Sequence, residues 1–183
     1  MIIFSLEALA DDSHRRHFLT PKKDDEVIWI NKCAKHKGYW KDWNTKKPWK
    51  PDYEAYNAAC GEDKPVKAVL DLAVDLLSND IDREYGDIVI WSTICKTQRH
   101  VLLEWIAYHL EIFGFDPEFY DKLLKMRPEG DTTPAHEIKE KWYDLHNVEN
   151  PRDSIEYVFE SDPESVAMWK RRGIFVFDCN QEE

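Results

Sequence analysis

Hydroxyl, carboxyl and lysine side chains follow four apolar runs that the sequence predicts to be strands. These residues are Ser5, Glu7, Ser92, Thr93, Lys139, Glu160, Ser161 and Asp162. The carboxyl ends of parallel strands meet at one edge of a sheet, so we expect these groups to converge. Hydroxyls, carboxylates and an ammonium group gathered together are typical of a site for a phosphate or a metal ion.

The same residues also have a purely structural interpretation. Ser92 and Thr93 could cap the helix that follows them, as hydroxyl residues often do. Ser161 could cap the next helix, with Glu164 at the third helical position. Lys139, which follows the third predicted strand, could be an ordinary solvated charge on a helix. Taken together, at the ends of successive strands, these residues favour a shared site.

A dense polar cluster follows the first strand. It contains Asp11, Asp12, His14, Arg15, Arg16 and His17. At the mouth of a site, Arg15 and Arg16 would bind phosphate oxygens through paired hydrogen bonds. As surface charges, they would be offset by the two aspartates. The sequence leaves both interpretations open.

Short apolar runs alternate with helical patterns along the chain. The predicted strands are Met1–Leu6, Asp87–Trp91, Leu123–Arg127, Ile155–Glu160 and Ile174–Asp178. The predicted helices are Val66–Leu77, Thr97–Leu110, one after Pro134, and Pro163–Arg171. This β-α-β alternation predicts an α/β fold in which helices cover both faces of a central parallel sheet.

Residues 18–60 do not follow this alternation, and we predict that they form an insertion or cap within a single domain, residues 1–183. The segment is rich in lysine and aromatic residues. Its tryptophans are Trp29, Trp40, Trp43 and Trp49. Such rings most simply pack a small core, and the sharper alternative is a platform on which a base or sugar stacks. Cys33 and His36 form a lone C-x-x-H pair, which is weak support for a zinc site.

The composition excludes some classes of function. The 183-residue chain has a net charge of −11, which argues against extended nucleic-acid binding, because that needs a basic face. A mononucleotide or a strand end is compatible with this charge. No apolar run reaches the ~18 residues of a membrane span, and no signal-peptide pattern starts the chain. Four scattered cysteines favour a reduced, cytoplasmic location.

Five stretches of the chain carry a likeness to a known family. They are MIIFSLEALADDSHRRHF, DYEAYNAACGEDKPVKAVL, DIVIWSTICKTQRHVLLEWI, LLKMRPEGDTTPAHEIKEKW and YVFESDPESVAMWKRRGIFVF. They resemble the haloacid dehalogenase (HAD) superfamily, and in detail the phosphatase domains of phage-type polynucleotide kinase/phosphatases. The resemblance implies a Rossmann-like three-layer sandwich. It also implies a bacteriophage protein of the host cytoplasm, derived from a nucleotide-binding hydrolase.

The family pattern implies a mechanism. An aspartate ending the first strand attacks phosphorus, and a second aspartate two residues later is the general acid and base. A hydroxyl residue and a lysine hold the phosphoryl oxygens, and acidic residues after the fourth strand help to hold Mg²⁺. On this pattern, the catalytic positions are Ser5, Glu7, Ser92 and Lys139, and the metal positions are Glu160, Ser161 and Asp162. The phosphate-binding candidates are Thr93, Arg15 and Arg16.

The chain departs from the pattern at the reacting groups. Ser5 stands where the family has its nucleophilic aspartate, Glu7 replaces the second aspartate, and Ser161 replaces an acidic residue. A serine hydroxyl needs an adjacent base to become nucleophilic, and it is a poorer Mg²⁺ ligand than a carboxylate. We therefore expect bound Mg²⁺ to be weak or absent.

Two hypotheses follow. In the first, catalysis is impaired and the protein binds a phosphorylated ligand, such as a nucleotide or a nucleic-acid end, or a protein partner. In the second, the protein is an active Mg²⁺-dependent phosphatase on nucleotides or 3′-phosphate ends, in which Glu7 or a carboxylate of Asp11 or Asp12 does the missing work. We favour the first, because several departures from the family pattern occur together.

Overall fold

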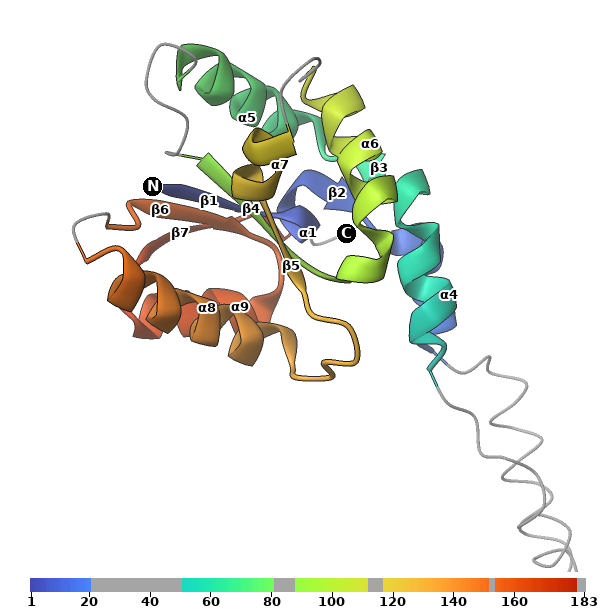
Figure 1. Ribbon diagram of the computed structural model, residues 1–183. Helices are drawn as coiled ribbons and strands as arrows, with labels where there is room; N and C mark the ends of the chain where they lie inside the picture. Colours follow the sequence, from blue (N-terminus) through green and yellow to red (C-terminus); the bar gives the residue numbers. More distant parts are fainter. Residues whose placement is uncertain (21–50, 81–87, 112–116, 152–153, 181–183) are drawn as a thin grey trace, which may run out of the picture.

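Five parallel strands form the centre of the structure. The computed structural model describes residues 1–20, 51–80, 88–111, 117–151 and 154–180. The strands are β1 (Ile2–Ser5), β4 (Ile88–Cys95), β5 (Leu124–Arg127), β6 (Tyr157–Glu160) and β7 (Phe175–Asp178). They lie in the order β5-β4-β1-β6-β7 (Figure 1), and every neighbouring pair is parallel. The predicted α/β class with a central parallel sheet is confirmed.

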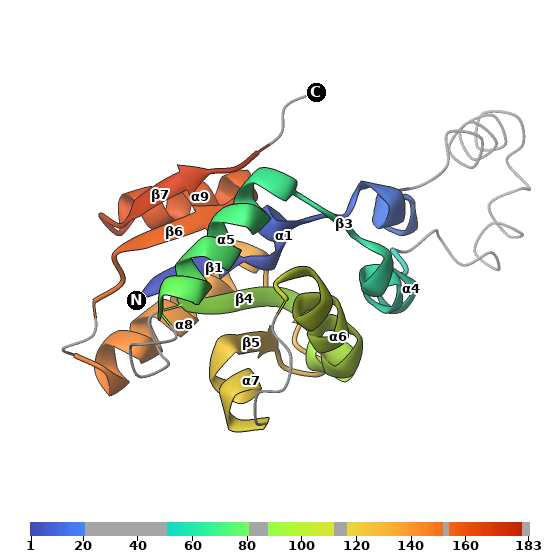
Figure 2. The ribbon, with the colours of Figure 1, turned by 90° about the horizontal axis from the view of Figure 1, so that it is seen from above.

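Helices cover the two faces of this sheet, as Figures 1 and 2 show. One face carries α5 (Lys67–Asp80), α6 (Arg99–His109) and α7 (Pro117–Leu123), and the other carries α8 (Ala135–Glu149) and α9 (Pro163–Arg171). The shorter elements are α1 (Leu6–Leu9), β2 (Ala10–Asp11), η1 (Ser13–Phe18), α4 (Tyr53–Ala58), η2 (Ala59–Glu62), β3 (Lys64–Pro65) and η3 (Lys96–Gln98). The four predicted helices are confirmed. α7 was not predicted, because seven residues are too few to show a clear helical period.

Alternate side chains of each strand pack into two separate cores. Phe4 and Ile90 belong to the core beneath α5 and α6, whereas Ile3 and Trp91 belong to the core beneath α8 and α9. Because residues two apart in a strand share a face, these rows continue to the carboxyl end of each strand. This alternation therefore determines which polar side chains at the strand ends face α8.

The second strand is longer than predicted. It runs to Cys95 rather than ending at Trp91, so Ser92 and Thr93 lie within the strand and do not follow it. The β-branched side chains of Thr93 and Ile94 suit an extended backbone, and Cys95 still pairs with Arg127 of β5, after a shift in register between Ser92 and Cys95. The helix after it begins at Arg99, and no side chain caps it. The capping role considered for the two hydroxyl residues is therefore wrong.

The end of the predicted insertion is an ordered helix. Asp52 caps α4 by accepting a hydrogen bond from the Ala55 amide at 2.9 Å, and α4 packs on η1 and η2. Residues 21–50, with the four clustered tryptophans and the Cys33–His36 pair, lie outside the described residues.

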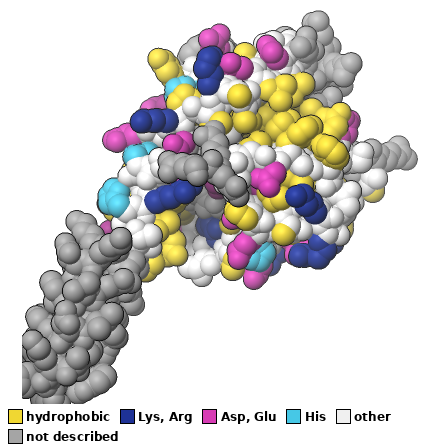
Figure 3. Space-filling view, turned by 180° about the vertical axis from the view of Figure 1, so that it is seen from behind, with side chains coloured by type: hydrophobic (Ala, Val, Ile, Leu, Met, Phe, Trp, Pro, Cys, Tyr) yellow, Lys and Arg dark blue, Asp and Glu magenta, His cyan; other side chains and the backbone are white. Residues whose placement is uncertain are grey.

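An aromatic row crosses the sheet on the side of α5. The rings of Phe4 and Phe159 stack with centroids 4.4 Å apart, and Phe159 stacks on Phe177 at 4.7 Å. Beyond them, Tyr157 and Phe175 are exposed, and Figure 3 shows hydrophobic side chains gathered on the face seen from behind. Among the described helices, none is long and apolar enough to cross a membrane.

Candidate functional site

Three strands carry polar side chains at or near their carboxyl ends, on the face that α8 covers. Ser5, Thr93 and Glu160 each lie two residues beyond an apolar residue of the core on that face, namely Ile3, Trp91 and Val158. The alternation of the strands therefore turns all three toward α8. β1 lies between β4 and β6, so the chain crosses over in both directions from this point, which is where ligands bind in open α/β sheets.

Lys139 of α8 lies at the centre of this group and is 1% exposed. Its Nζ donates to Glu160 Oε2 at 2.8 Å and to Ser5 Oγ at 3.2 Å, and it lies 3.4 Å from Glu7 Oε2. Burial lowers the pKa of the lysine, but the charges of Glu160 and Glu7 raise it further than burial lowers it. The ammonium group therefore stays charged.

Glu7 closes the group from the side of α1. Its carboxylate accepts hydrogen bonds from the Ser5 hydroxyl and, at 2.6 Å, from the Thr93 hydroxyl. Burial raises the pKa of Glu7, but the Lys139 charge and the two hydroxyls together lower it to about 2. Glu7 is thus an ionised carboxylate held by two hydroxyls and an ammonium group. We refer to Ser5, Glu7, Thr93, Lys139 and Glu160 as the Glu7 network.

The acidic residues at the end of β6 and just after it also accept hydrogen bonds. Glu160 Oε1 accepts the backbone N–H groups of Ser161 and Asp162 at 3.1 and 3.2 Å, and Ser161 Oγ donates to the backbone oxygen of Glu7 at 2.7 Å. Asp162 caps α9 by accepting from the Ser165 amide at 2.9 Å. The cap of this helix is therefore Asp162 rather than Ser161, and the capping box considered for Ser161 and Glu164 is wrong.

The chemistry of these donors does not fit Mg²⁺ in the arrangement described. Both carboxylates of the Glu7 network face the Lys139 ammonium, which would repel a dication placed between them. Within the described ranges, no three His, Cys, Asp or Glu side chains are grouped so that they could hold a metal ion. That Glu160, Ser161 and Asp162 are metal positions at which Mg²⁺ is weakly bound or absent remains a prediction.

Three other candidate residues lie apart from the Glu7 network. Ser92 lies on the opposite row of β4 and accepts a hydrogen bond from the Ile94 amide at 3.2 Å. The Arg15 guanidinium is buried against Asp63, with both contacts at 2.7 Å. Arg16 is exposed and paired with Asp12 at 2.7 Å. The structure does not bring these three side chains together with the network, and their roles in catalysis and phosphate binding remain predictions.

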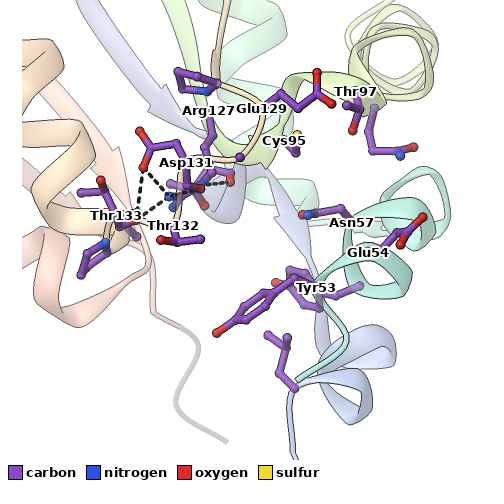
Figure 4. A pocket seen from close by; sticks show the side chains of 18 residues that line it. Tyr53, Glu54, Asn57, Cys95, Thr97, Arg127, Glu129, Asp131, Thr132 and Thr133 are labelled. Carbon is purple, nitrogen blue, oxygen red and sulfur yellow. Dashed lines mark hydrogen bonds and ion pairs between the residues drawn. The ribbon is translucent and has the colours of Figure 1, made fainter. Parts of the chain in front are cut away.

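A cleft of about 870 Å³ lies beside the network, and Thr93 lines it. In Figure 4, Tyr53 and Asn57 of α4 lie on one side, and Arg127 lies with the loop between β5 and α8 on the other. Arg127 Nε donates to the backbone oxygen of Thr93 at 2.7 Å, and its Nη1 donates to the backbone oxygen of Thr133. Arg127 therefore ties the end of β4, and with it Thr93, to the wall of the cleft.

The comparisons with known proteins show the fold. No protein-family model matches the sequence, and no curated protein gives a significant match. A chain in a structure of the Pnkp1/Rnl/Hen1 RNA repair complex matches with a TM-score of 0.55 and 16% identity, over 100% of this chain and 42% of that chain. A chain in a second structure of the Pnkp1/Rnl/Hen1 complex matches with a TM-score of 0.51 and 18% identity, over 72% of this chain and 40% of that chain. The chain thus spans about two fifths of the length of those it resembles.

Sequence reasoning missed two features of the site. It placed Ser92 rather than Thr93 among the catalytic positions, although the period of two from Trp91 would have turned Thr93 toward Ser5. It also passed over Arg127, which lies within the stretch MRPEGD. An arginine at the end of a predicted strand, directly before an acidic loop, was the available signal.

Proposed function

We propose that this protein is a HAD-like, phosphatase-derived protein with an impaired catalytic centre that binds a phosphorylated ligand. The observation that carries the proposal is the closed Glu7 network, in which each hydroxyl donates to the Glu7 carboxylate and the ammonium group donates to both carboxylates and to the Ser5 hydroxyl. The network combines the chemistry of an oxyanion site with the loss of a free nucleophile.

Ser5 lies at the position of the missing nucleophile and is not activated. The side chain is 1% exposed, and its hydroxyl donates to Glu7. A serine becomes nucleophilic when a base removes its proton, and a carboxylate with a pKa of about 2 is a weak base at neutral pH. Ser5 therefore lacks the activation that an attack on phosphorus needs.

The hydrogen-bond donors of the Glu7 network and its position next to the cleft favour a phosphorylated ligand. Hydroxyls and an ammonium group suit phosphoryl oxygens, and the adjoining cleft of about 870 Å³ has room for a nucleoside. The fold likeness to chains of an RNA repair complex and the phage-type resemblance favour a nucleotide or a nucleic-acid end. The net charge of −11 favours a short ligand over a long polyanion.

The experiment compares phosphate release by the natural chain with release by a Ser5→Asp/Ser161→Asp variant, with Mg²⁺ and a panel of nucleoside 3′- and 5′-monophosphates. We expect no release above background from the natural chain and a measurable gain in the double variant, which restores the two carboxylates. Release by the natural chain would overturn the proposal. Tryptophan fluorescence gives the binding arm, because Trp91 lies two residues before Thr93.

One observation favours the active phosphatase as a second candidate. The Glu7 side chain is 22% exposed, so an ionised carboxylate is accessible beside the cleft and could replace the missing aspartate. In that case Glu7→Gln abolishes phosphate release that the natural chain shows. The two candidates thus differ in the first measurement.

A further inference from the structure

Three elements of the fold direct donors at one carboxylate. Ser5 at the end of β1 and Thr93 in β4 donate their hydroxyls to Glu7, and the Lys139 ammonium lies 3.4 Å from it. These donors are fixed by the strand register and by the docking of α8. Lys139 also donates to Ser5 Oγ and to Glu160, so it has partners besides Glu7, which reaches the donors from α1.

The carboxylate has the charge and the shape of a fragment of a phosphoryl group. It presents two oxygens on one centre, one to the Thr93 hydroxyl and one to Ser5 and Lys139. A tetrahedral oxyanion would accept the same three donors. Since Ser5 and Lys139 are 1% exposed, an incoming anion reaches them only by taking the position of the carboxylate.

We infer that Glu7 is a built-in competitor that occupies the oxyanion site, and that a phosphoryl group binds only when the Glu7 side chain leaves. The inference rests on the proposed function, because it concerns the same site. It adds that the unliganded protein is held closed by its own carboxylate. The apparent affinity for a phosphoryl group is then the intrinsic affinity reduced by the fraction of molecules in which Glu7 is displaced.

The experiment titrates inorganic phosphate into the full chain by calorimetry, with the natural protein, Glu7→Ala and Glu7→Ser. We expect phosphate affinity at least tenfold higher in both variants. The control is Glu118→Ala, which removes one negative charge from the exposed surface of α7 and leaves the three donors occupied. We expect its phosphate affinity to stay within about twofold of the natural protein. An equal gain in this control would overturn the inference, because it would reduce the effect to net charge.

A second series separates this inference from the proposed function. The natural chain is titrated with a nucleoside 3′-monophosphate, and circular dichroism establishes that each variant is folded. If the natural chain binds the nucleotide while folded Glu7→Ala gains no affinity for phosphate, the inference is wrong and the proposed function stands. If Glu7→Ala gains affinity while the natural chain binds no phosphorylated ligand, Glu7 is a permanent plug and the proposed function is wrong. Should Glu7→Ala not fold, Glu7→Ser decides in the same way.

Discussion

The Arg15–Asp63 pair and the Glu7 network are two groups of buried charges that differ in the number of elements they join and in their position relative to the cleft. The Arg15–Asp63 pair has both contacts at 2.7 Å, and His14 Nδ1 lies 3.7 Å from Asp63 Oδ1. The guanidinium also lies 4.1 Å from the centre of the Tyr56 ring. The Glu7 network instead joins three strands and two helices around one lysine. The pair joins η1 to the residue that follows η2, whereas the network gathers donors at one edge of the sheet, where Thr93 lines the cleft.

This difference distinguishes buried charges that only stabilise the fold from buried charges that also belong to the candidate site. Asp63 also accepts a hydrogen bond from Trp105 Nε1 through its backbone oxygen at 2.8 Å, so the pair is anchored on every side. In the network, Glu7 is 22% exposed and accepts a hydrogen bond from Thr93, which lines the cleft, whereas Glu160 is fully buried. The substitutions below test whether removing charge from each group acts on stability alone or on ligand binding as well.

The largest expected effect is that of Lys139→Met. It leaves the carboxylates of Glu160 and Glu7 without their cation, and losing one partner of a buried ion pair costs about 3–5 kcal/mol. Urea unfolding measures the loss. A Lys139→Met/Glu160→Leu variant removes both buried charges, and we expect it to regain part of the stability. A single variant as stable as the natural protein would contradict the buried network.

Asp63→Ala is expected to cost about 3 kcal/mol in the free energy of unfolding, because it leaves the Arg15 guanidinium buried and unpaired. In contrast to Lys139→Met, it should leave phosphate affinity unchanged in folded protein. Calorimetric titration at a temperature where the variant is folded checks this. A joint loss of stability and affinity would place Arg15 within the ligand site, as first predicted from the sequence.

Glu7→Gln is expected to lower the free energy of unfolding by about 2 kcal/mol at pH 7, because hydrogen bonds to a charged group are lost. The folded-state pKa of Glu7 is lowered from 4.5 to about 2, so its stabilisation is present above pH 4.5 and is lost as the pH falls toward 2. The difference between natural protein and variant should shrink over that range. A difference independent of pH would show that the Glu7 charge contributes little.

The smallest expected effect is that of Lys67→Ala, which removes an ion pair with Asp71 at 3.0 Å on the exposed side of α5. Exposed pairs of this kind contribute less than about 1 kcal/mol. Thermal unfolding at low and high salt measures the change. A cost comparable with that of Asp63→Ala would show that burial does not distinguish the charges of this protein.

The sequence predicted the fold well, because its central strands β1 and β4 are mostly buried and its helices are amphipathic. Residues Ile2 to Phe4 and Ile88 to Trp91 are short apolar runs. Between Val66 and Leu77, apolar residues recur every three or four positions, which indicates a helix. The strand ends were harder to predict. Ser92 and Thr93 fit a cap as well as a strand, and only pairing with β5 decides that β4 continues to Cys95.

The sequence predicted the residues of the Glu7 network but not the hydrogen bonds that join them. Ser5, Glu7, Thr93, Lys139 and Glu160 were all named from sequence. That the Glu7 carboxylate accepts from both hydroxyls depends on the path of α1, which the sequence does not reveal. The burial of Arg15 against Asp63 was missed for a related reason, because 48 residues separate the two in the chain.

The most direct test of the account combines binding and turnover in one sample. The natural protein is brought to equilibrium with a nucleoside 3′-monophosphate and Mg²⁺, the bound fraction is measured by equilibrium dialysis, and the recovered ligand is analysed for free phosphate. We expect saturable binding with the ligand recovered intact. Release of phosphate that disappears in Glu7→Gln would contradict the impaired centre and would make Glu7 the working carboxylate.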